Sequence, residues 1–439
     1  MRSPIGIRAE DKNRWERRAP LTPEHVRELV DEQGLAVRVE PSARRAFPDR
    51  DYVEAGADLD ASLTGCRVVL GVKEIPPEKL ERGRVYVIFS HVIKGQPAGR
   101  PLLRRLLELG CTLVDYESIL DRKGRRLIFF GRHAGYAGMI DALWALGQRL
   151  AAEGSFTPFE HLRLARHYAG LDDALAHVAR LGEHVRHLGI PPPRRPIVAG
   201  FTGSGNVARG AMEVFDRLPV VDIVPEELLD LSEDPDRPKN AVYRCAFERH
   251  HRYRRRDRGS FDAVELAERP KLYESGLGPF LPHLTMLVHG AYWEPPQPRL
   301  VTREMLAELH ACEQQPKLRV IADLSCDIRG AIEATVRTST PGEPVYVYDS
   351  ETDSGSTGLE GRGTVILAVD NLPCELPVEA SHHFGDSLMR FVGALARADW
   401  DRPLDELGLP EEMEAATIVH RGRLTPAYKH LERALEAAS

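Results

Sequence analysis

Residues 197–210 read IVAGFTGSGNVARG, an apolar, β-branched run that enters a glycine-rich turn and then a helical pattern. Gly203, Gly205 and Ala208 match G-x-G-x-x-A, and apolar residues recur on one face of the segment that follows. In a dinucleotide-binding domain such glycines let a pyrophosphate approach the backbone, and the helix N-terminus supplies free N–H groups. The stretch therefore predicts dinucleotide binding, with a purely structural turn as the alternative.

The rest of the chain alternates short apolar runs with amphipathic segments, which is typical of an α/β protein. The expected strands are residues 5–8, 37–40, 67–72, 85–90 and 112–115, followed by 197–201, 220–224, 285–289, 319–321 and 365–369. The expected helices are residues 22–33, 101–109, 139–152, 161–188, 379–398 and 426–437. A proline-rich connector at 191–196 marks a plausible domain boundary.

The composition excludes several classes of protein. The chain has 439 residues, a formal net charge of −7 and no apolar run long enough to span a membrane. Six scattered cysteines without a Cys-x-x-Cys pair argue against a zinc site or a disulfide framework and favour a reducing cytoplasm. The acidic balance argues against general nucleic-acid binding, although residues 249–258 form a basic run. That run is either a solvated loop or a site for a phosphate.

Polar residues follow two neighbouring expected strands at the ends where open α/β sheets place their active sites. Lys73 and Glu74 follow the strand at 67–72, and His91 and Lys94 follow the strand at 85–90. A partly buried lysine can exchange protons near neutral pH, and a histidine does so without help. Taken singly, each could be an ordinary surface lysine or a strand-end histidine. Only nine lysines stand among 59 lysines and arginines, which draws attention to position 73.

The sequence leaves the choice between NAD and NADP open. An acidic residue that binds the ribose is expected about 20 residues after the glycine turn, at the tip of the next strand. Asp222 lies inside the expected strand and Glu226 lies beyond Pro225, so neither is clearly at a tip.

Stretches along nearly the whole chain match one known family. In chain order they are RAEDK (8–12), WERRAPL (15–21), DYVEAGA (51–57), LGVKE (70–74), FSHVIK (89–94), LVDYE (113–117), FGRHAGYAGM (130–139), FTGSGNV (201–207), RHH (249–251), GAYWE (290–294), ADLSCD (322–327) and DNLPCELP (370–377). On these residues the chain resembles the lysine–2-oxoglutarate reductase family, the lysine-forming saccharopine dehydrogenases. The resemblance is closest to the reductase half of bifunctional aminoadipic semialdehyde synthase and extends to the alanine dehydrogenase N-terminal domain. One departure is His133, where the fungal enzyme has an aromatic residue.

The resemblance implies a fold and a domain division. The fold would be two Rossmann-like domains with parallel sheets separated by a cleft, the C-terminal helices returning to the first domain. Residues 1–140 with 375–439 would form the substrate domain, and 141–374 the dinucleotide-binding domain.

The resemblance also implies a reaction and the residues that serve it. The reaction would be reductive condensation of L-lysine with 2-oxoglutarate by NADH or NADPH, without a metal; the alternative is another amine and 2-oxo acid. Lys73 and His91 would be the acid–base pair, with Glu74 tuning the lysine. The other implied site residues are Arg18, Lys94 and Arg132 for substrate carboxylates, Glu117 for the amine, and Gly203, Ser204, Gly205, Asn206, Val207 and Asp323 for the cofactor. The partners would be these small molecules, with no nucleic acid and no membrane.

Overall fold

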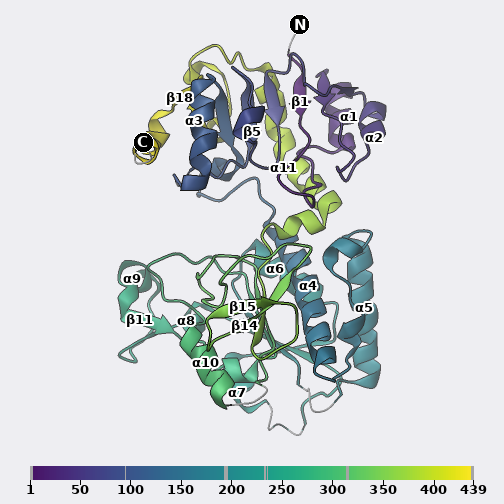
Figure 1. Cartoon of the computed structure of the whole chain (residues 1–439), viewed down its shortest axis with the longest axis vertical. Coiled ribbons are helices and arrows are strands. Elements are labelled where there is room, and N and C mark those ends of the chain that lie inside the picture. Colours follow the sequence, from purple (N-terminus) through teal and green to yellow (C-terminus); the bar gives the residue numbers. More distant parts are fainter. Residues whose placement is uncertain are drawn as a thin grey trace. The chain divides into compact units, whose positions relative to one another are not determined.

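The computed structural model describes residues 3–93, 95–191, 196–231, 234, 236–312 and 316–436 (Figure 1). The chain divides into two compact units, of which unit 1 comprises Met1–Phe130 with Pro377–Ser439 and unit 2 comprises Gly131–Leu376. The chain thus passes between units at 130/131 and 376/377, ten residues before and two residues after the boundaries at 140/141 and 374/375 expected from the sequence.

Unit 1 is built on one eight-stranded sheet in the order β18-β17-β6-β5-β4-β1-β2-β3. The strands are β1 (Ile5–Ile7), β2 (Val37–Val39), β3 (Asp58–Leu59), β4 (Val68–Leu70), β5 (Val85–Ile88), β6 (Thr112–Asp115), β17 (Thr417–His420) and β18 (Arg423–Leu424). Strands β1 to β6 pair in parallel, whereas β17 runs antiparallel to β6 and to β18. The central strands are apolar and buried, as expected for parallel strands covered on both faces.

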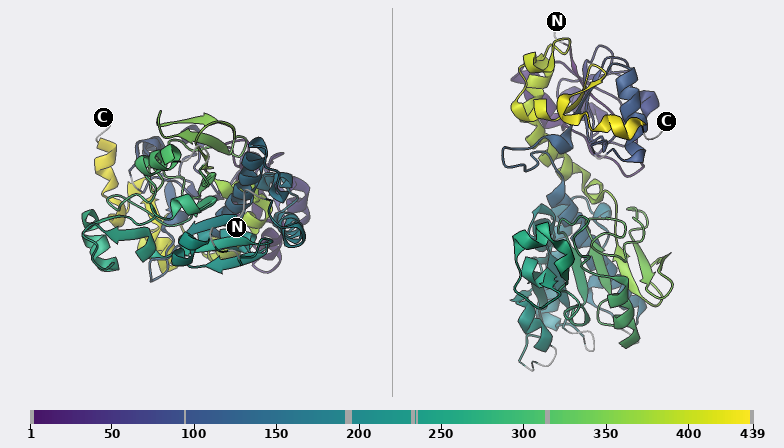
Figure 2. Two further views of the ribbon diagram at one scale, coloured as in Figure 1. Left: turned by 90° about the horizontal axis from the view of Figure 1, so that it is seen from below. Right: turned by 90° about the vertical axis from the view of Figure 1, so that its left-hand side faces the viewer.

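Helices from both ends of the chain cover this sheet. They are α1 (Pro23–Asp31), α2 (Asp49–Glu54), α3 (Arg100–Glu108), α11 (Pro377–Arg397), α12 (Glu411–Ala415) and α13 (Leu431–Glu436). Phe384 and Leu388 of α11 lie in the same apolar core as Val26 and Leu29 of α1. Figure 2 shows the yellow C-terminal segment packed together with the purple and blue N-terminal segment. The structure therefore confirms the expectation that the C-terminal tail returns to the first domain.

Unit 2 contains a second eight-stranded sheet, in the order β15-β14-β16-β13-β12-β7-β9-β8. The strands are β7 (Val198–Thr202), β8 (Val220–Ile223), β9 (Val242–Phe247), β12 (Met286–His289), β13 (Val320–Asp323), β14 (Val345–Asp349), β15 (Ser354–Thr357) and β16 (Thr364–Leu367). The helices are α4 (Gly131–Ala152), α5 (Leu171–Leu188), α6 (Asn206–Phe215), α7 (Pro225–Asp230), α8 (Arg249–Arg252), α9 (Ala263–Glu268) and α10 (Arg303–Cys312). Strands β10 (Tyr253–Arg255) and β11 (Tyr273–Ser275) form a separate antiparallel pair. The expected α/β class, with two largely parallel sheets, is confirmed.

Helix α4 packs on α6 at very short range because both helices carry glycine at the crossing. A Cβ added to Gly135 would lie 2.1 Å from the Val207 carbonyl oxygen, and one added to Gly210 would lie 2.2 Å from the Arg132 carbonyl oxygen. This contact lets α4 begin at Gly131, eight residues before the expected start, although glycine is a weak helix former.

Two expected helices are wrong in part. The segment 161–188 becomes α5 only from Leu171 onward, and a short 3₁₀ turn at Ala165–His167 precedes it. The buried Asp141 carboxylate accepts a hydrogen bond from the Ala165 N–H (2.8 Å), which holds that turn outside the helix. The segment 426–437 likewise splits into a 3₁₀ turn at Pro426–Tyr428 and α13.

No helix in the described part of the chain is both long and apolar enough to cross a membrane.

Candidate functional site

The carboxyl ends of β1, β4, β5 and β6 lie side by side at one edge of the unit 1 sheet. The residues that follow these strands are polar: Arg8 and Glu10 after β1, Lys73 and Glu74 after β4, His91 after β5, and Glu117 after β6. Open α/β sheets place ligands at such an edge. The strand order therefore brings together most of the side chains singled out in the first domain.

Glu10 holds the turn that carries Lys73. Its buried carboxylate accepts hydrogen bonds from the backbone N–H groups of Val72 (2.7 Å) and Lys73 (3.0 Å), and Arg8 Nη1 lies 3.8 Å away. Burial raises the pKa of Glu10 to about 7, against the lowering effects of Arg8 and the two backbone donors. Sequence analysis missed this residue, because its partners lie 62 and 63 positions further along the chain.

The Lys73 side chain is half-buried, and its ammonium group has no hydrogen-bond or ion-pair partner among the described residues. Burial lowers the pKa of Lys73 below its usual range, and the charge of Arg18 lowers it further, whereas the charges of Glu16 and Glu74 raise it. A lysine in these surroundings can release and regain a proton closer to neutral pH than a surface lysine.

Glu74 links His91 to a second lysine. Its carboxylate lies 3.2 Å from His91 Nδ1 and forms an ion pair with Lys12. Despite the opposing effect of burial, these two hydrogen bonds and the Lys12 charge lower the pKa of Glu74 to about 2. Glu74 thus contacts His91 and Lys12 directly and acts on Lys73 only through its charge. Lys12 is a further residue that the sequence did not single out.

A pocket of about 450 Å³ opens beside His91. It is lined by His91, Ile93, Gln96, Glu117, Ser118, Leu120, Gly124 and Arg126. Glu117 forms an ion pair with Arg126, so the pocket wall carries both an acceptor for an amine and a donor for a carboxylate. Buried Asp115 shapes this wall by accepting hydrogen bonds from the backbone N–H groups of Ser90 (3.0 Å) and Glu117 (2.8 Å).

The three expected carboxylate-binding cations have different surroundings. Arg18 is buried, donates to both oxygens of Glu16 (2.8 and 2.6 Å), and its guanidinium lies 4.2 Å from the centre of the Phe130 ring. Arg132 belongs to unit 2, where it pairs with Glu213 on α6. Lys94 lies outside the described residues. The structure therefore brings Lys73, Glu74, His91 and Glu117 to one edge, and it shows the arginines engaged with carboxylates of the chain.

The glycine turn lies between β7 and α6 in unit 2. Gly203 has a φ of 103°, and a Cβ there would lie 2.7 Å from the Gly290 carbonyl oxygen, so only glycine fits. Gly205 has open space within 4 Å of where its Cβ would be, and Ser204 beside it is exposed. Helix α6 begins at Asn206 with Val207 in its first turn, so its free N–H groups lie at this opening. This exposed backbone fits a pyrophosphate.

Asp323 ends the neighbouring strand β13 and is fully buried. Its carboxylate accepts from Ser325 Oγ (2.7 Å) and Thr335 Oγ1 (2.6 Å), so it holds the loop after β13 in place. Its register partner on β12 is His289, whose Nδ1 lies 2.7 Å from Thr202 Oγ1 at the end of β7. Burial lowers the pKa of His289, although the charge of Asp323 acts in the opposite direction. Sequence analysis missed His289, because nothing local distinguishes it.

Three arginines of the basic run at 249–258 are paired with carboxylates within unit 2. Arg254 and Arg256 pair with Glu274, and Arg255 pairs with Asp257 and Glu265. The pairs with Glu274 link β10 to β11.

Comparisons with known proteins identify the family. The model of the alanine dehydrogenase/PNT N-terminal domain matches residues 6–137, and that of the C-terminal domain of the same family matches residues 285–427, together more than half of the chain. The chain belongs to the alanine dehydrogenase/PNT family. This membership confirms the family that the sequence led us to expect. It also confirms the expected enzyme class, the nicotinamide-dependent oxidoreductases.

The chain is similar to named relatives over nearly its whole length. It is 37% identical to alpha-aminoadipic semialdehyde synthase, mitochondrial, from Mus musculus, and the match covers 99% of this chain and 48% of that relative. It is 36% identical to the alpha-aminoadipic semialdehyde synthase from Arabidopsis thaliana, and this match covers 98% of this chain and 41% of that relative. The chain thus spans about half the length of these relatives. It is 28% identical to saccharopine dehydrogenase [NAD(+), L-lysine-forming] from Neurospora crassa, covering 90% of this chain and 91% of that one.

Two solved structures share the fold. An L-alanine dehydrogenase superposes with a TM-score of 0.64 at 21% identity and covers 98% of this chain and 99% of its own. The transhydrogenase from Sinorhizobium meliloti superposes with a TM-score of 0.59 at 18% identity, and the match covers 96% of this chain and 99% of the transhydrogenase chain.

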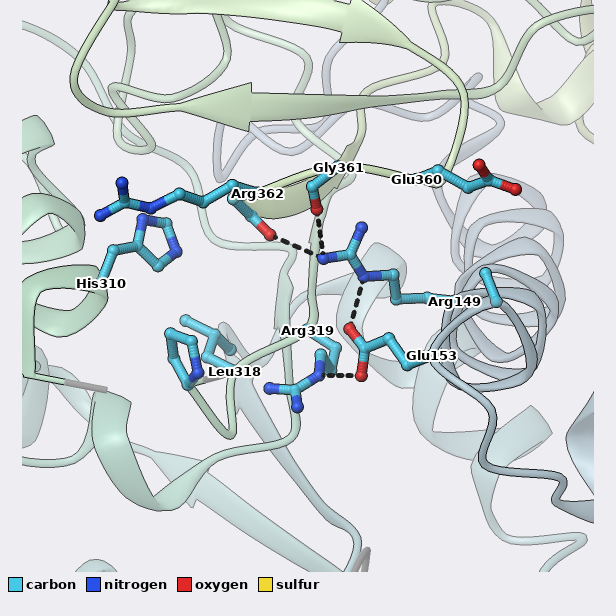
Figure 3. Close-up of a pocket in the computed structure, with 11 residues that line it drawn as sticks. Arg149, Glu153, His310, Leu318, Arg319, Glu360, Gly361 and Arg362 are labelled. Atoms are coloured by element: carbon cyan, nitrogen blue, oxygen red, sulfur yellow. Dashed lines mark hydrogen bonds and ion pairs between the residues drawn. The ribbon is translucent and has the colours of Figure 1, made fainter. Parts of the chain in front are cut away.

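A second cavity, of about 400 Å³, lies in unit 2 at the amino ends of β13 and β16, opposite the glycine turn (Figure 3). Glu153 bridges Arg149 and Arg319 there, at 2.7 Å from each Nε, and Arg149 also donates to the Gly361 carbonyl (2.8 Å). The charges are satisfied largely by one another, which is typical of a structural ion-pair network. In the described part of the chain, no group of three His, Cys, Asp or Glu side chains could hold a metal ion.

Proposed function

We propose that the chain is a lysine-forming saccharopine dehydrogenase, which condenses L-lysine with 2-oxoglutarate and reduces the product with NADH or NADPH. The observation that carries the proposal is the edge of unit 1, where half-buried Lys73 lies beside the Glu74–His91 pair. The similarity to saccharopine-forming relatives over nearly the whole chain supports the same substrate class.

The residues of unit 1 supply the proton transfers. The lysine ε-amine adds to the keto carbon, the hydroxyl leaves as water, and hydride addition to the resulting C=N carbon completes the secondary amine. Loss of water requires an acid, and deprotonation of the incoming amine requires a base. Lys73, with its lowered pKa, and His91, oriented by Glu74, take these two roles. Glu117 receives the substrate amine.

Carboxylates of the substrates need cations. Saccharopine carries three carboxylates, and Arg18, Lys94 and Arg132 are proposed to bind them as the family resemblance implies. Arg126 is a further candidate, because it lines the pocket beside His91 and is exposed. Each arginine already faces a carboxylate of the chain, so binding would exchange or extend an existing ion pair.

Unit 2 is proposed as the cofactor domain and unit 1 as the substrate domain. Gly203, Ser204, Gly205, Asn206 and Val207 would hold the pyrophosphate through backbone N–H groups, and Asp323 would support the nicotinamide end through the loop after β13. The nicotinamide, when bound, supplies the hydride.

The direct test mixes the protein with L-lysine, 2-oxoglutarate and either NADH or NADPH, and follows oxidation of the cofactor. We expect turnover with this pair that exceeds turnover with ornithine, alanine or ammonia in place of lysine, and with pyruvate in place of 2-oxoglutarate. No oxidation above background with either cofactor would refute the proposal. A preference for another amine or oxo acid would support the alternative reductive amination expected from the sequence.

The cytoplasmic location expected from the sequence stays a prediction, since the animal relatives are named as mitochondrial. Fractionation of the source cells followed by detection of the protein would test it.

A further inference from the structure

The cavity at the amino ends of β13 and β16 is not used by the proposed dehydrogenase chemistry. The glycine turn follows the carboxyl end of β7, and β7, β12 and β13 run parallel, so the turn and the cavity lie at opposite ends of these strands. The cavity measures about 400 Å³, within the range of small-molecule sites. Its polar lining comes from α4 (Arg149, Glu153), α10 (His310), the start of β13 (Arg319) and the β15–β16 loop (360–363), all in unit 2.

Two buried guanidiniums share one carboxylate in this cavity. Arg149 is 7% exposed and Arg319 is 4% exposed, and the Nε of each donates to Glu153 at 2.7 Å. Two positive charges therefore face one negative charge at this carboxylate. A positive charge that is buried without a counter-ion costs free energy, and a bound anion would offset that cost.

The two arginines differ in how the rest of each guanidinium is satisfied. The Nη groups of Arg149 donate to loop carbonyls, among them those of Gly361 (2.8 Å) and Gly363 (3.3 Å). Neither Nη1 nor Nη2 of Arg319 has a hydrogen bond in the part of the chain that the structure describes. Nη1 is closed off from solvent, so water does not replace the missing acceptor, whereas Nη2 is not closed off in this way. Figure 3 shows both nitrogens on the side of the guanidinium that faces away from Glu153.

His310 reports the positive charge of the cavity but does not compete for an anion. Its two ring nitrogens lie 3.3 Å from Ser350 Oγ and 3.1 Å from Thr364 Oγ1, so both are engaged. Burial lowers the pKa of His310, and the charges of three arginines of the cavity lower it further, whereas Asp349 raises it. A bound anion would act against these arginines.

The rim of the cavity offers a second guanidinium. Arg362 is exposed and pairs with Glu351, which is also exposed, at 2.9 Å. Exposed pairs of this kind contribute little free energy, so Arg362 can turn to a ligand at small cost. Figure 3 shows the carboxylate of Glu360, the other charged residue of this loop, pointing away from Arg319.

We propose that this cavity binds the phosphate group of a small molecule, held by Arg319 at the inner end and by Arg362 at the rim. A phosphate carries about two negative charges at neutral pH and three acceptor oxygens, so it can accept from two guanidiniums on different elements. The remaining lining of the cavity is apolar and could contact the organic part of a phosphate monoester; it consists of Ala152, Pro316 and Leu318. The site is independent of the proposed dehydrogenase function.

Isothermal titration calorimetry on the full-length protein tests this site, without nicotinamide and at constant ionic strength. The probes are inorganic phosphate, glycerol phosphate and, as a carboxylate, succinate. We expect both phosphates to bind saturably and more tightly than succinate. Arg319→Met should weaken phosphate binding by at least about 10-fold, as expected for loss of a charge-assisted hydrogen bond. Arg362→Ala should weaken it by at least about 3-fold, because its pair is exposed.

The variants separate this cavity from other anion sites, including the glycine turn. Arg319→Met leaves the Arg149–Glu153 pair intact, and melting temperatures show whether the fold is kept. If Arg319→Met does not fold, Arg362→Ala at the exposed rim carries the same test. Arg254→Ala removes an arginine of unit 2 that is paired with Glu274 elsewhere, and it should retain phosphate affinity within about 2-fold.

The ring signals of His310 in NMR spectra localise the binding. They are assigned with His310→Gln, and they should shift when phosphate is added to the unchanged protein but not to Arg319→Met. Tighter binding of glycerol phosphate would identify the ligand as a monoester, and tighter binding of inorganic phosphate would identify it as the free ion; both results support the site.

The proposed site is wrong if no phosphate binds saturably below about 10 mM, or if neither Arg319→Met nor Arg362→Ala weakens binding. It is equally wrong if phosphate leaves the His310 signals unchanged or if succinate binds as tightly. None of these measurements depends on turnover, so the proposed function stands or falls separately.

Discussion

Lys73 shows how one side chain differs from others of its type because of its surroundings. The Glu10 carboxylate fixes its backbone, burial lowers its pKa, and no partner among the described residues holds its ammonium group. Lys79, six positions later, is exposed and pairs with Asp11 (2.5 Å). An arginine could replace the second lysine without loss of charge, but at position 73 it could not give up a proton.

Replacing Lys73 therefore tests proton transfer separately from charge. We expect Lys73→Met and Lys73→Arg both to lower kcat by about 10²–10⁴-fold, because neither side chain can exchange a proton. Cofactor affinity, measured by fluorescence, should be unchanged in both. Lys79→Met serves as the matched control and should retain kcat within about 2-fold. Substantial turnover by Lys73→Arg would show that position 73 needs only a positive charge.

Asp141 and Glu375 form a buried pair of carboxyl groups in unit 2. Burial raises the pKa of both groups above the usual carboxyl range, and the neighbouring carboxyl adds to this effect at Glu375. Asp141 accepts from the Ala165 N–H (2.8 Å), and Glu375 accepts from the Arg166 N–H (3.3 Å). Two carboxyl groups in contact can share one proton but resist the loss of it.

This pair predicts that stability falls as the pH rises. Between about pH 4 and pH 7 the unfolded chain releases protons that the folded chain keeps, so the free energy of unfolding decreases over this window. Asp141→Asn keeps an oxygen acceptor and offers an N–H to Glu375. We expect it to be more stable than the unchanged protein at pH 8, on the order of 2 kcal/mol, and to differ less at pH 4.5. Urea unfolding at both pH values measures this, and an unchanged pH slope would contradict it.

At the scale of elements, local pattern was enough for much of the fold. Strands β4, β5, β6 and β7 lie within the expected runs or shift by one residue, because short apolar, β-branched runs are typical of buried parallel strands. The glycine turn could also be predicted from the sequence, because its strand, turn and helix follow one another directly in the chain.

The pairing of strands that lie far apart in the chain could not be predicted from local sequence patterns. Strands β17 and β18 in the tail and the β14–β15 hairpin were not expected, and the position of β9 between β8 and β7 changes which residues reach the turn. In the site, Glu10 and Lys12 act on residues 62 positions away, so no local pattern identifies their partners. Sequence analysis thus found which strand ends carry the polar residues, and the sheet order determines which of them meet.

Two glycines of the turn between β7 and α6, Gly203 and Gly205, are expected to respond differently to replacement by alanine. Gly203→Ala would place a Cβ 2.7 Å from the Gly290 carbonyl oxygen at a φ of 103°, so we expect a loss of about 1–3 kcal/mol in stability together with weaker cofactor binding. Gly205→Ala meets nothing within 4 Å and should change stability by less than about 1 kcal/mol. Its methyl group would occupy the space in which the pyrophosphate approaches the backbone, so NADPH binding should still weaken by at least about 10-fold. Full cofactor affinity in Gly205→Ala would place the pyrophosphate elsewhere.

At the scale of the whole molecule, the two units differ in how the chain builds them. Unit 2 is one continuous segment, Gly131–Leu376, inserted between the two segments of unit 1. Its two large apolar clusters consist entirely of residues between 137 and 376, so its core does not draw on unit 1. A segment that buries its own core and closes its own sheet meets the conditions for folding alone.

The fragment Gly131–Leu376 should therefore fold in isolation and bind the cofactor. We expect cooperative unfolding by circular dichroism and an NADPH dissociation constant within about 3-fold of that of the full chain, because the glycine turn and Asp323, which are proposed to hold the cofactor, lie inside the fragment. The same fragment with Gly205→Ala is the control and should fold but bind weakly. It should show no turnover of lysine and 2-oxoglutarate, since Lys73 and His91 lie in unit 1. A folded fragment that fails to bind NADPH would mean that cofactor binding requires residues of unit 1, and the assignment of unit 2 as a self-sufficient cofactor domain would be wrong.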